Sequence, residues 1–124
     1  MRYLLLVRVH ADAEGAPPPG AIGTWLEDVD RSGQRVVGAR LRPTAETTVV
    51  RRRGGELLVT DGPFADAKEW IGGFDVLEVG SREEAIEIAS RHPMVELGTI
   101  ELSAFWPFTP EELATGAEIE TVSS

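Results

Sequence analysis

The sequence predicts one α+β domain in which two helices pack on one face of an antiparallel sheet. Two amphipathic patterns, one beginning at Ile22 and one at Ser81, each lie between runs of β-favouring residues. Between them, Gly54-Gly55 separates two further β-favouring runs, as in a hairpin. The predicted order is therefore strand, helix, strand, hairpin, strand, helix and strand. A length of 124 residues suits a single domain of this kind.

The first strand and the first helix follow from the spacing of apolar residues. Residues 2–9 are apolar with little alternation, which is typical of a central strand covered on both faces. Three prolines at 17–19 then exclude both helix and strand pairing. A helix is predicted over residues 21–32, with Gly33 as its stop, because apolar residues recur at i, i+3, i+4 and i+7. These residues are Ile22, Trp25, Leu26 and Val29.

The hairpin is predicted over residues 47–60, with the two glycines at its turn. Both central positions of the favoured two-residue turn need positive φ, which glycine adopts without strain. This turn also sets the register, since it places Arg53 opposite Glu56 and Asp61 opposite Thr48. The remaining strands are predicted at 35–41, at 74–79 after Gly72-Gly73, and at 98–106.

A capping box predicts the start of the second helix. Ser81 would cap backbone amides while Glu84 reaches back toward the residues before the helix. The helix is predicted to end before Pro93. We expect His92 in its last turn, where a protonated imidazole would interact favourably with the helix dipole. The residues predicted to be buried are Ala85, Ile86, Ile88 and Ala89.

The domain is predicted to cover residues 1–108, followed by a short helix and tail at 109–124. Thr109 with Pro110 behind it is a helix-start signal. Three aromatic residues precede this helix, and we expect them to pack on this subunit or on a partner. They are Phe105, Trp106 and Phe108.

Apart from the hairpin, the element order is βαββαβ, the ferredoxin-like arrangement with both helices on one sheet face. Such a fold leaves the other face of the sheet bare. A face of Leu, Val, Ile and Phe side chains is not stable in water on a monomer. The sequence therefore predicts a homodimer in which two sheets stack face to face about a two-fold axis.

Composition excludes several classes of protein. Acidic residues outnumber basic ones 21 to 12, and a net charge of −9 repels nucleic acid. There is no cysteine, hence no disulfide and no thiolate metal site. The N-terminal apolar run is too short for a secretory leader or a membrane span, so we expect a cytoplasmic protein. No motif for a metal or an organic cofactor is found, and neither is predicted.

Residues 59–79 gather reactive side chains between two predicted strands. A strand connection commonly needs two to five residues, whereas this one takes about a dozen. We expect Asp61, Lys68 and Glu69 to be the catalytic residues, at the rim of a hollow beneath the two helices.

Each of these residues also has a structural interpretation. In an Asp-Gly-Pro turn, Asp61 can hydrogen-bond downstream amides instead of acting as a base. Lys68 can form a structural ion pair with Asp61 or Glu69 instead of holding an anionic substrate.

Three further residues are predicted to contact a substrate. Phe64 would provide apolar cover beside the turn, Arg40 would add an anion-binding group at a strand end, and Trp70 follows the lysine–glutamate pair. These side chains suit a small anionic or carbonyl-bearing molecule.

Asp61-Gly62-Pro63-Phe64, followed by Lys68-Glu69 and Gly72-Gly73, resembles the signature of the YCII-related family, in its DGPF-domain branch. The resemblance extends from the first strand through Trp106. It implies a dimeric α/β-barrel type of fold and frequent genomic association with sigma-factor genes. Relatives with the shorter YCII pattern carry a histidine and an aspartate proposed as an acid–base pair. Residues 21–32 of this chain contain no histidine, so that pair is not carried over.

Two functions remain open from the sequence. One is a dimeric protein that binds a small molecule in a polar cleft, with or without cofactor-free acid–base chemistry, so that enzyme activity is undecided. The other is a non-catalytic accessory module linked to transcription, which would bind other proteins through its acidic surface and the aromatic segment around Trp106.

Overall fold

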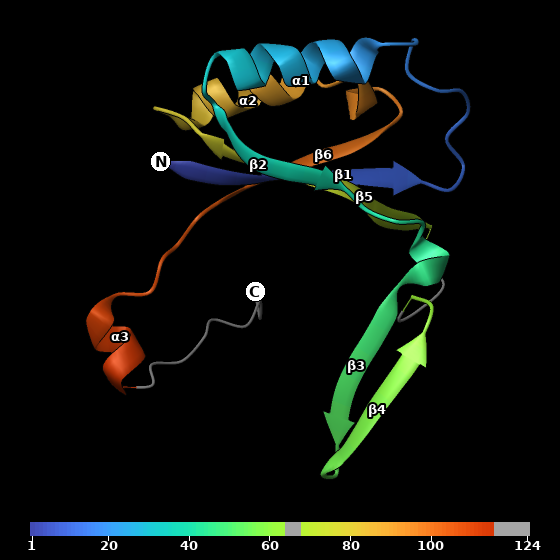
Figure 1. Cartoon of the computed structure of the whole chain (residues 1–124), viewed down its shortest axis with the longest axis vertical. Helices are drawn as coiled ribbons and strands as arrows, with labels where there is room; N and C mark the ends of the chain where they lie inside the picture. Colours follow the sequence, from blue (N-terminus) through green and yellow to red (C-terminus); the bar gives the residue numbers. More distant parts are fainter. Residues whose placement is uncertain (64–67, 116–124) are drawn as a thin grey trace.

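The computed structural model describes residues 1–63 and 68–115 of the chain (Figure 1). The elements, in order, are β1 (Arg2–His10), α1 (Ala21–Arg31), β2 (Arg35–Arg40), the 3₁₀ turn η1 (Thr44–Glu46), β3 (Thr48–Arg53), β4 (Glu56–Asp61), β5 (Glu69–Glu78), α2 (Arg82–Ser90), the 3₁₀ turn η2 (Pro93–Val95), β6 (Gly98–Ala104) and α3 (Pro110–Thr115). The main antiparallel sheet has the strand order β2-β5-β1-β6, and β3 and β4 pair as a separate two-stranded sheet. This is the predicted ferredoxin-like order with an added hairpin.

Both α1 and α2 lie on the same face of the main sheet (Figure 1). The core between them is centred on four fully buried aliphatic side chains, Leu5, Val29, Leu77 and Ile88. Burial of each such side chain is worth about 1.5–3 kcal/mol. Trp25 of α1 joins this core, and its indole Nε1 donates a hydrogen bond of 3.0 Å to the carbonyl oxygen of Ile88 in α2. The two helices are thus tied to each other as well as to the sheet.

The helix boundaries confirm the predicted caps. The backbone N–H of Glu84 donates to Ser81 Oγ at 3.1 Å, and the Glu84 carboxylate accepts from the N–H of Gly80 at 2.7 Å. Gly33 ends α1 with a φ of 73°. These contacts satisfy amides and carbonyls that a helix end otherwise leaves unpaired.

The hairpin also has the predicted geometry. Gly54 and Gly55 adopt φ values of 57° and 80°, and Arg53 pairs with Glu56. Asp61 pairs with Thr48 at the other end. The hairpin extends away from the main sheet, on the side opposite the helices (Figure 1).

Two strand boundaries differ from the prediction. β5 begins at Glu69, not Phe74, so Gly72 and Gly73 lie inside the strand. The two glycines were predicted to precede the strand, but within it they allow close approach of the backbone. A Cβ on Gly72 would lie 2.8 Å from Val9 Cγ2, and one on Gly73 would lie 2.9 Å from the carbonyl oxygen of Ala39. β6 ends at Ala104 and not at Trp106, although the N–H of Phe105 still donates to the carbonyl oxygen of Arg2 in β1 at 2.9 Å.

The face coverage of β1 also differs from the prediction. Tyr3, Leu5 and Val7 are buried under the helices, but Leu4 and Leu6 on the other face are only partly buried. In a single chain the central strand is therefore covered on one face.

Gly38 and Gly23 provide a matched pair for testing backbone packing. We expect Gly38→Ala to lower the free energy of unfolding by about 1–3 kcal/mol, because the new Cβ would overlap Asp75 Oδ1 and lie 2.7 Å from the carbonyl oxygen of Phe74. Gly23→Ala lies in α1 with nothing within 4 Å, so it should raise that free energy by about 0.5–1 kcal/mol. Urea denaturation of both variants measures the difference. Equal effects would contradict the close approach at Gly38.

Candidate functional site

Two hollows border three of the residues predicted to form the site, Lys68 and Glu69 at one and Arg40 at the other. The first, which we call the rim hollow, has a volume of about 880 Å³ and lies where β1 ends and β5 begins. Its lining residues are Arg8, His10, Ala11, Asp12, Lys68 and Glu69. The second, which we call the helix cavity, has a volume of about 250 Å³. It is lined by Val7, Val9, Ile22, Trp25, Leu26, Arg35, Ala39, Arg40, Gly72, Gly73, Phe74, Asp75, His92 and Met94.

The rim hollow brings Lys68 and Glu69 together with His10. The His10 ring lies with Nδ1 3.3 Å from Glu69 Oε2 and Nε2 2.8 Å from Thr99 Oγ1. The N–H of Ala11 donates to the carbonyl oxygen of Lys68 at 2.7 Å, which holds the end of one strand to the start of the other. His10 was not among the predicted site residues. The signal was its position at the end of the first strand, which pairs with Glu69 only in the folded sheet.

The rim hollow does not lie beneath the helices. Side chains alternate along β1, and Val7 points into the core, so Arg8 and His10 point to the opposite face. The residues that line the rim hollow include none from α1 or α2. A hollow bordered by Lys68 and Glu69 is present, but on the open side of the sheet.

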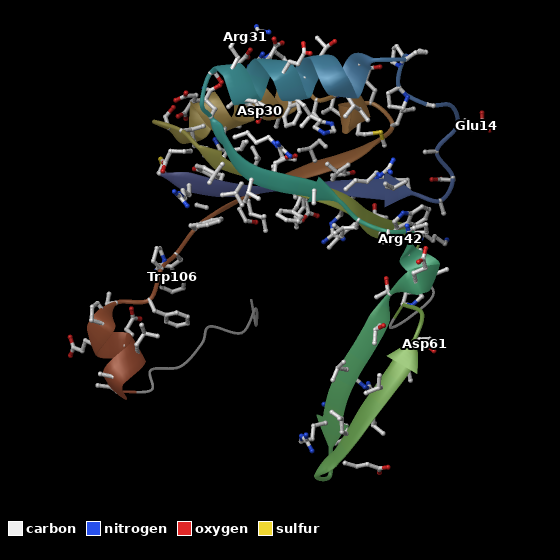
Figure 2. The ribbon with its side chains drawn as sticks, viewed as in Figure 1. Glu14, Asp30, Arg31, Arg42, Asp61 and Trp106 are labelled. Atoms are coloured by element: carbon white, nitrogen blue, oxygen red, sulfur yellow. The ribbon has the colours of Figure 1, made fainter. Side chains whose placement is uncertain are left out.

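Asp61 stands apart from both hollows. It is the exposed last residue of β4, on the hairpin (Figure 2). The turn after it is closed by the backbone, since the N–H of Gly62 donates to the carbonyl oxygen of Thr47 at 2.6 Å. To the described residues, the Asp61 side chain makes no hydrogen bond or ion pair. Phe64 lies outside the described residues.

Arg40 and Trp70 both belong to strands of the main sheet. Arg40 pairs with Gly73 at the end of β2 and lines the helix cavity. Within residues 1–63 and 68–115, its side chain has no hydrogen-bond or ion-pair partner. Trp70 pairs with Val9 and is partly buried, and it lines neither hollow.

A buried ion pair borders the helix cavity and was not predicted from the sequence. Asp75 is 6% exposed, and Arg35 Nε donates to its Oδ1 at 2.6 Å. Arg35 Nη1 also donates a hydrogen bond of 3.3 Å to Asp30 Oδ1 in α1. Burial raises the pKa of Asp75 above its ordinary value, and the guanidinium of Arg35 opposes that shift. In the sequence Asp75 is a single polar residue in an apolar strand, and its partner Arg35 lies 40 positions earlier. The local spacing of residues therefore gave no sign of the pair.

His92 does not have the predicted role at a helix end. α2 ends at Ser90, and His92 instead caps η2, where its Nδ1 accepts a hydrogen bond of 3.0 Å from the N–H of Met94. The ring is 6% exposed and meets Trp25 edge to face, with centroids 4.6 Å apart. Burial lowers the pKa of His92, so the imidazole is neutral and does not interact with the helix dipole as a cation.

This hydrogen bond assigns the tautomer of His92. Because Nδ1 accepts, the proton of the neutral ring is on Nε2. Among the described residues Nε2 has no hydrogen-bond partner, and His92 lines the helix cavity. The helix cavity therefore combines apolar walls with two lining residues that carry polar groups without a protein partner in the described chain, Arg40 with its guanidinium and His92 with its Nε2. His92 also borders another hollow, between α1 and η2.

The lowered pKa of His92 predicts how stability changes with pH. Above the ordinary value of 6.5 the ring is neutral in both the folded and the unfolded state. Below that value the unfolded chain binds the proton first, so the free energy of unfolding should fall as the pH decreases from 6.5 toward the lowered folded-state pKa.

His92→Gln tests this dependence in urea titrations at a series of pH values. Relative to wild type, the variant should lose the fall below pH 6.5, whereas His10→Gln should keep it. An unchanged pH profile in His92→Gln would contradict the assignment of a neutral buried ring.

The architecture and its cavity together define a class of protein. It is a ferredoxin-like α+β domain with a hollow between its helices and its sheet. The chain belongs to the YCII-related family, because the model of the YCII-related domain matches residues 1–109. The family resemblance seen in the sequence is thus confirmed.

A curated relative matches part of the chain. It is an uncharacterised protein from Rhizobium meliloti (strain 1021), 43% identical over 51 residues, which is 41% of each chain. The match therefore spans about two fifths of that relative's length.

The structure also bears on metals and membranes. Within residues 1–63 and 68–115, no group of three or more His, Cys, Asp or Glu side chains could hold a metal ion. In the same part of the chain, no helix has the length and apolarity that crossing a membrane requires.

Proposed function

We propose that the protein binds a small molecule with a carboxylate or carbonyl group in the helix cavity. The observation that carries this proposal is the pair of polar groups, Arg40 and His92, at an otherwise largely apolar cavity. Ligand sites are typically apolar hollows with a few convergent polar groups, and residues with shifted pKa values gather there. Asp75 and His92 have such shifts. A volume of about 250 Å³ holds roughly eight waters at their liquid volume, which suits a small metabolite.

The two polar groups would recognise different parts of that molecule. Arg40 offers a guanidinium for a carboxylate, and the N–H at Nε2 of His92 offers one hydrogen bond to a carbonyl oxygen. The proton on Nε2 is also the group that would take part in acid–base chemistry without a cofactor. The apolar body of the ligand would contact Val9, Ile22 and Trp25.

The rim hollow is the second candidate, and its polar lining favours a more hydrophilic ligand. It contains Lys68 and Glu69, two of the residues predicted to be catalytic. Lys68 could hold an anion there, with His10 and Glu69 beside it. The same ligand screen separates the two sites.

A thermal-shift screen with small carboxylic and oxo acids tests the proposal. A hit should raise the melting temperature of wild type, and the shift should be lost in Arg40→Gln and in His92→Phe if the ligand occupies the helix cavity. Lys68→Ala and Glu69→Ala are the matched variants of the rim hollow, and Asp61→Ala is a control outside both. Loss of the shift in Lys68→Ala alone would place the ligand in the rim hollow and overturn the first site.

We further propose that the open face of the main sheet packs on a second copy of the chain. The face opposite the helices carries apolar side chains in neighbouring pairs, because Leu4 is opposite Val76 and Leu6 is opposite Phe74. Val37 continues this surface and is 53% exposed. An apolar sheet face of this kind favours association about a two-fold axis.

Light scattering at micromolar concentration should report about twice the 13.5 kDa chain mass. Leu6→Lys should shift the mass toward that of one chain, since a lysine in the centre of an apolar interface must be desolvated. Ile86 was predicted to be buried but is 41% exposed, on the outer side of α2. Ile86→Lys is therefore the control, and it should leave the mass unchanged. A single-chain mass for wild type would contradict the proposed dimer.

A finer assignment belongs to the same proposal. The Asp61-Gly62-Pro63-Phe64 motif supports a place in the DGPF branch of the family. The alternative function, an accessory module, is supported by the exposure of Trp106 at 76%. Retention of a protein partner by wild type and its loss in Trp106→Ala, with no ligand found for either hollow, would favour that alternative.

A further inference from the structure

Two extended segments leave the main sheet on the side of its open face (Figure 1). One is the β3–β4 hairpin, residues 48–61, which we call the arm. The other is residues 105–115, which includes α3 and which we call the C-terminal segment. In Figure 1 they lie on opposite sides of the molecule, so the arm and the C-terminal segment of one chain do not touch.

The arm has one uncovered apolar face. Residues directly opposite each other in an antiparallel pair lie on the same face. Val50 is opposite Val59, and two positions along, on the same face, Arg52 is opposite Leu57. The three aliphatic side chains on this face are exposed: Val50 by 62%, Val59 by 57% and Leu57 by 53%. On the other face, Val49 and Leu58 are partly buried.

Such an arm needs a covering surface. Its strands pair only with each other and not with the main sheet in the described chain. A two-stranded sheet alone is marginally stable in water, and it is stabilised by further strands or by a second layer packed on its apolar face. The three aliphatic side chains of the arm are the natural contact for that layer.

The C-terminal segment has complementary properties. Its large apolar side chains are exposed, with Trp106 at 76% and Leu113 at 67%. Its only charged residues are Glu111 and Glu112, whereas the arm carries three arginines against two acids in a chain of net charge −9. Of these arginines, Arg52 lies on the uncovered face beside Leu57, and Asp61 lies at the other end of that face. The turn end of the uncovered face thus combines aliphatic surface with one positive charge, and the C-terminal segment offers aromatic surface with negative charge.

We propose that the arm of one subunit packs on the C-terminal segment of a second copy of this chain. Since a two-fold axis makes every contact occur twice, arm-to-segment contacts would form at both ends of the paired sheets. Both segments lie on the open-face side, which is the side that a second copy would occupy. This inference rests on the proposed homodimer and adds to it the exchange of arms.

Single-cysteine variants test the exchange, because the chain contains no cysteine. Val59→Cys and Trp106→Cys are purified separately, mixed to allow subunit exchange, and treated with a short bismaleimide. Cross-linked dimers should form in the mixture and not in either variant alone. Thr60→Cys, on the opposite face of the same strand, replaces Val59→Cys as the control and should cross-link several-fold less.

Each other outcome overturns the proposal in a different way. Cross-linking of Val59→Cys with itself means that arm meets arm, and the pairing with the C-terminal segment is then wrong. A two-chain mass by light scattering without any cross-link would support the dimer but contradict the contact between the arm and the C-terminal segment. A one-chain mass would contradict both the dimer and this contact, and would not bear on the proposed ligand.

Association constants provide an independent readout. Leu57→Lys should raise the dimer dissociation constant by about tenfold or more, because it places a second positive charge beside Arg52 and an ammonium group within the apolar contact. Thr60→Lys should change it little. An equal effect of the two substitutions would mean that the uncovered face of the arm has no special role, and would overturn the proposal.

Discussion

The hydrogen bond from Trp25 to Ile88 is the constraint on which the helical layer depends. Trp25 is 3% exposed, so its indole N–H is removed from water and must find an acceptor in the protein. The acceptor is the carbonyl oxygen of Ile88 in the last turn of α2, which also accepts a backbone hydrogen bond of 3.2 Å from the N–H of Arg91. The bond thus links α1 to a defined position on α2. The indole also meets the His92 ring edge to face, and both residues line the helix cavity.

The helix cavity is bordered by two strand residues without side chains and by a buried ion pair. Gly72 and Gly73 line the cavity, and neither has room for a Cβ against its neighbours. Arg35 and Asp75 also line it, with the carboxylate buried and its pKa raised. Close approach of the backbone at β5 thus requires glycine at both positions beside the cavity.

The candidate site divides into a part that the sequence could predict and a part that it could not. Lys68 and Glu69 were predicted from their place in an unusually charged connection, and they do share a hollow. Arg40 was predicted from its place at a strand end, and it lies at the other hollow. His92 and Asp75 were missed as site residues. Their neighbours Trp25 and Arg35 are far away in the sequence, and each looks like an ordinary member of its own element until the sheet forms.

By itself, the sequence determined the local structure. Caps at Ser81 and Gly33, the two-glycine turn and apolar spacing act within a few residues, so the order of helices and strands and the register of the hairpin could be predicted from them. Only the tertiary structure decided which faces of the sheet the polar residues occupy. A bulge opposite Val7 and an early start of β5 put Glu69 beside His10 on the open face, and burial made His92 neutral. Strand pairing and desolvation act between distant residues, and no local pattern encodes them.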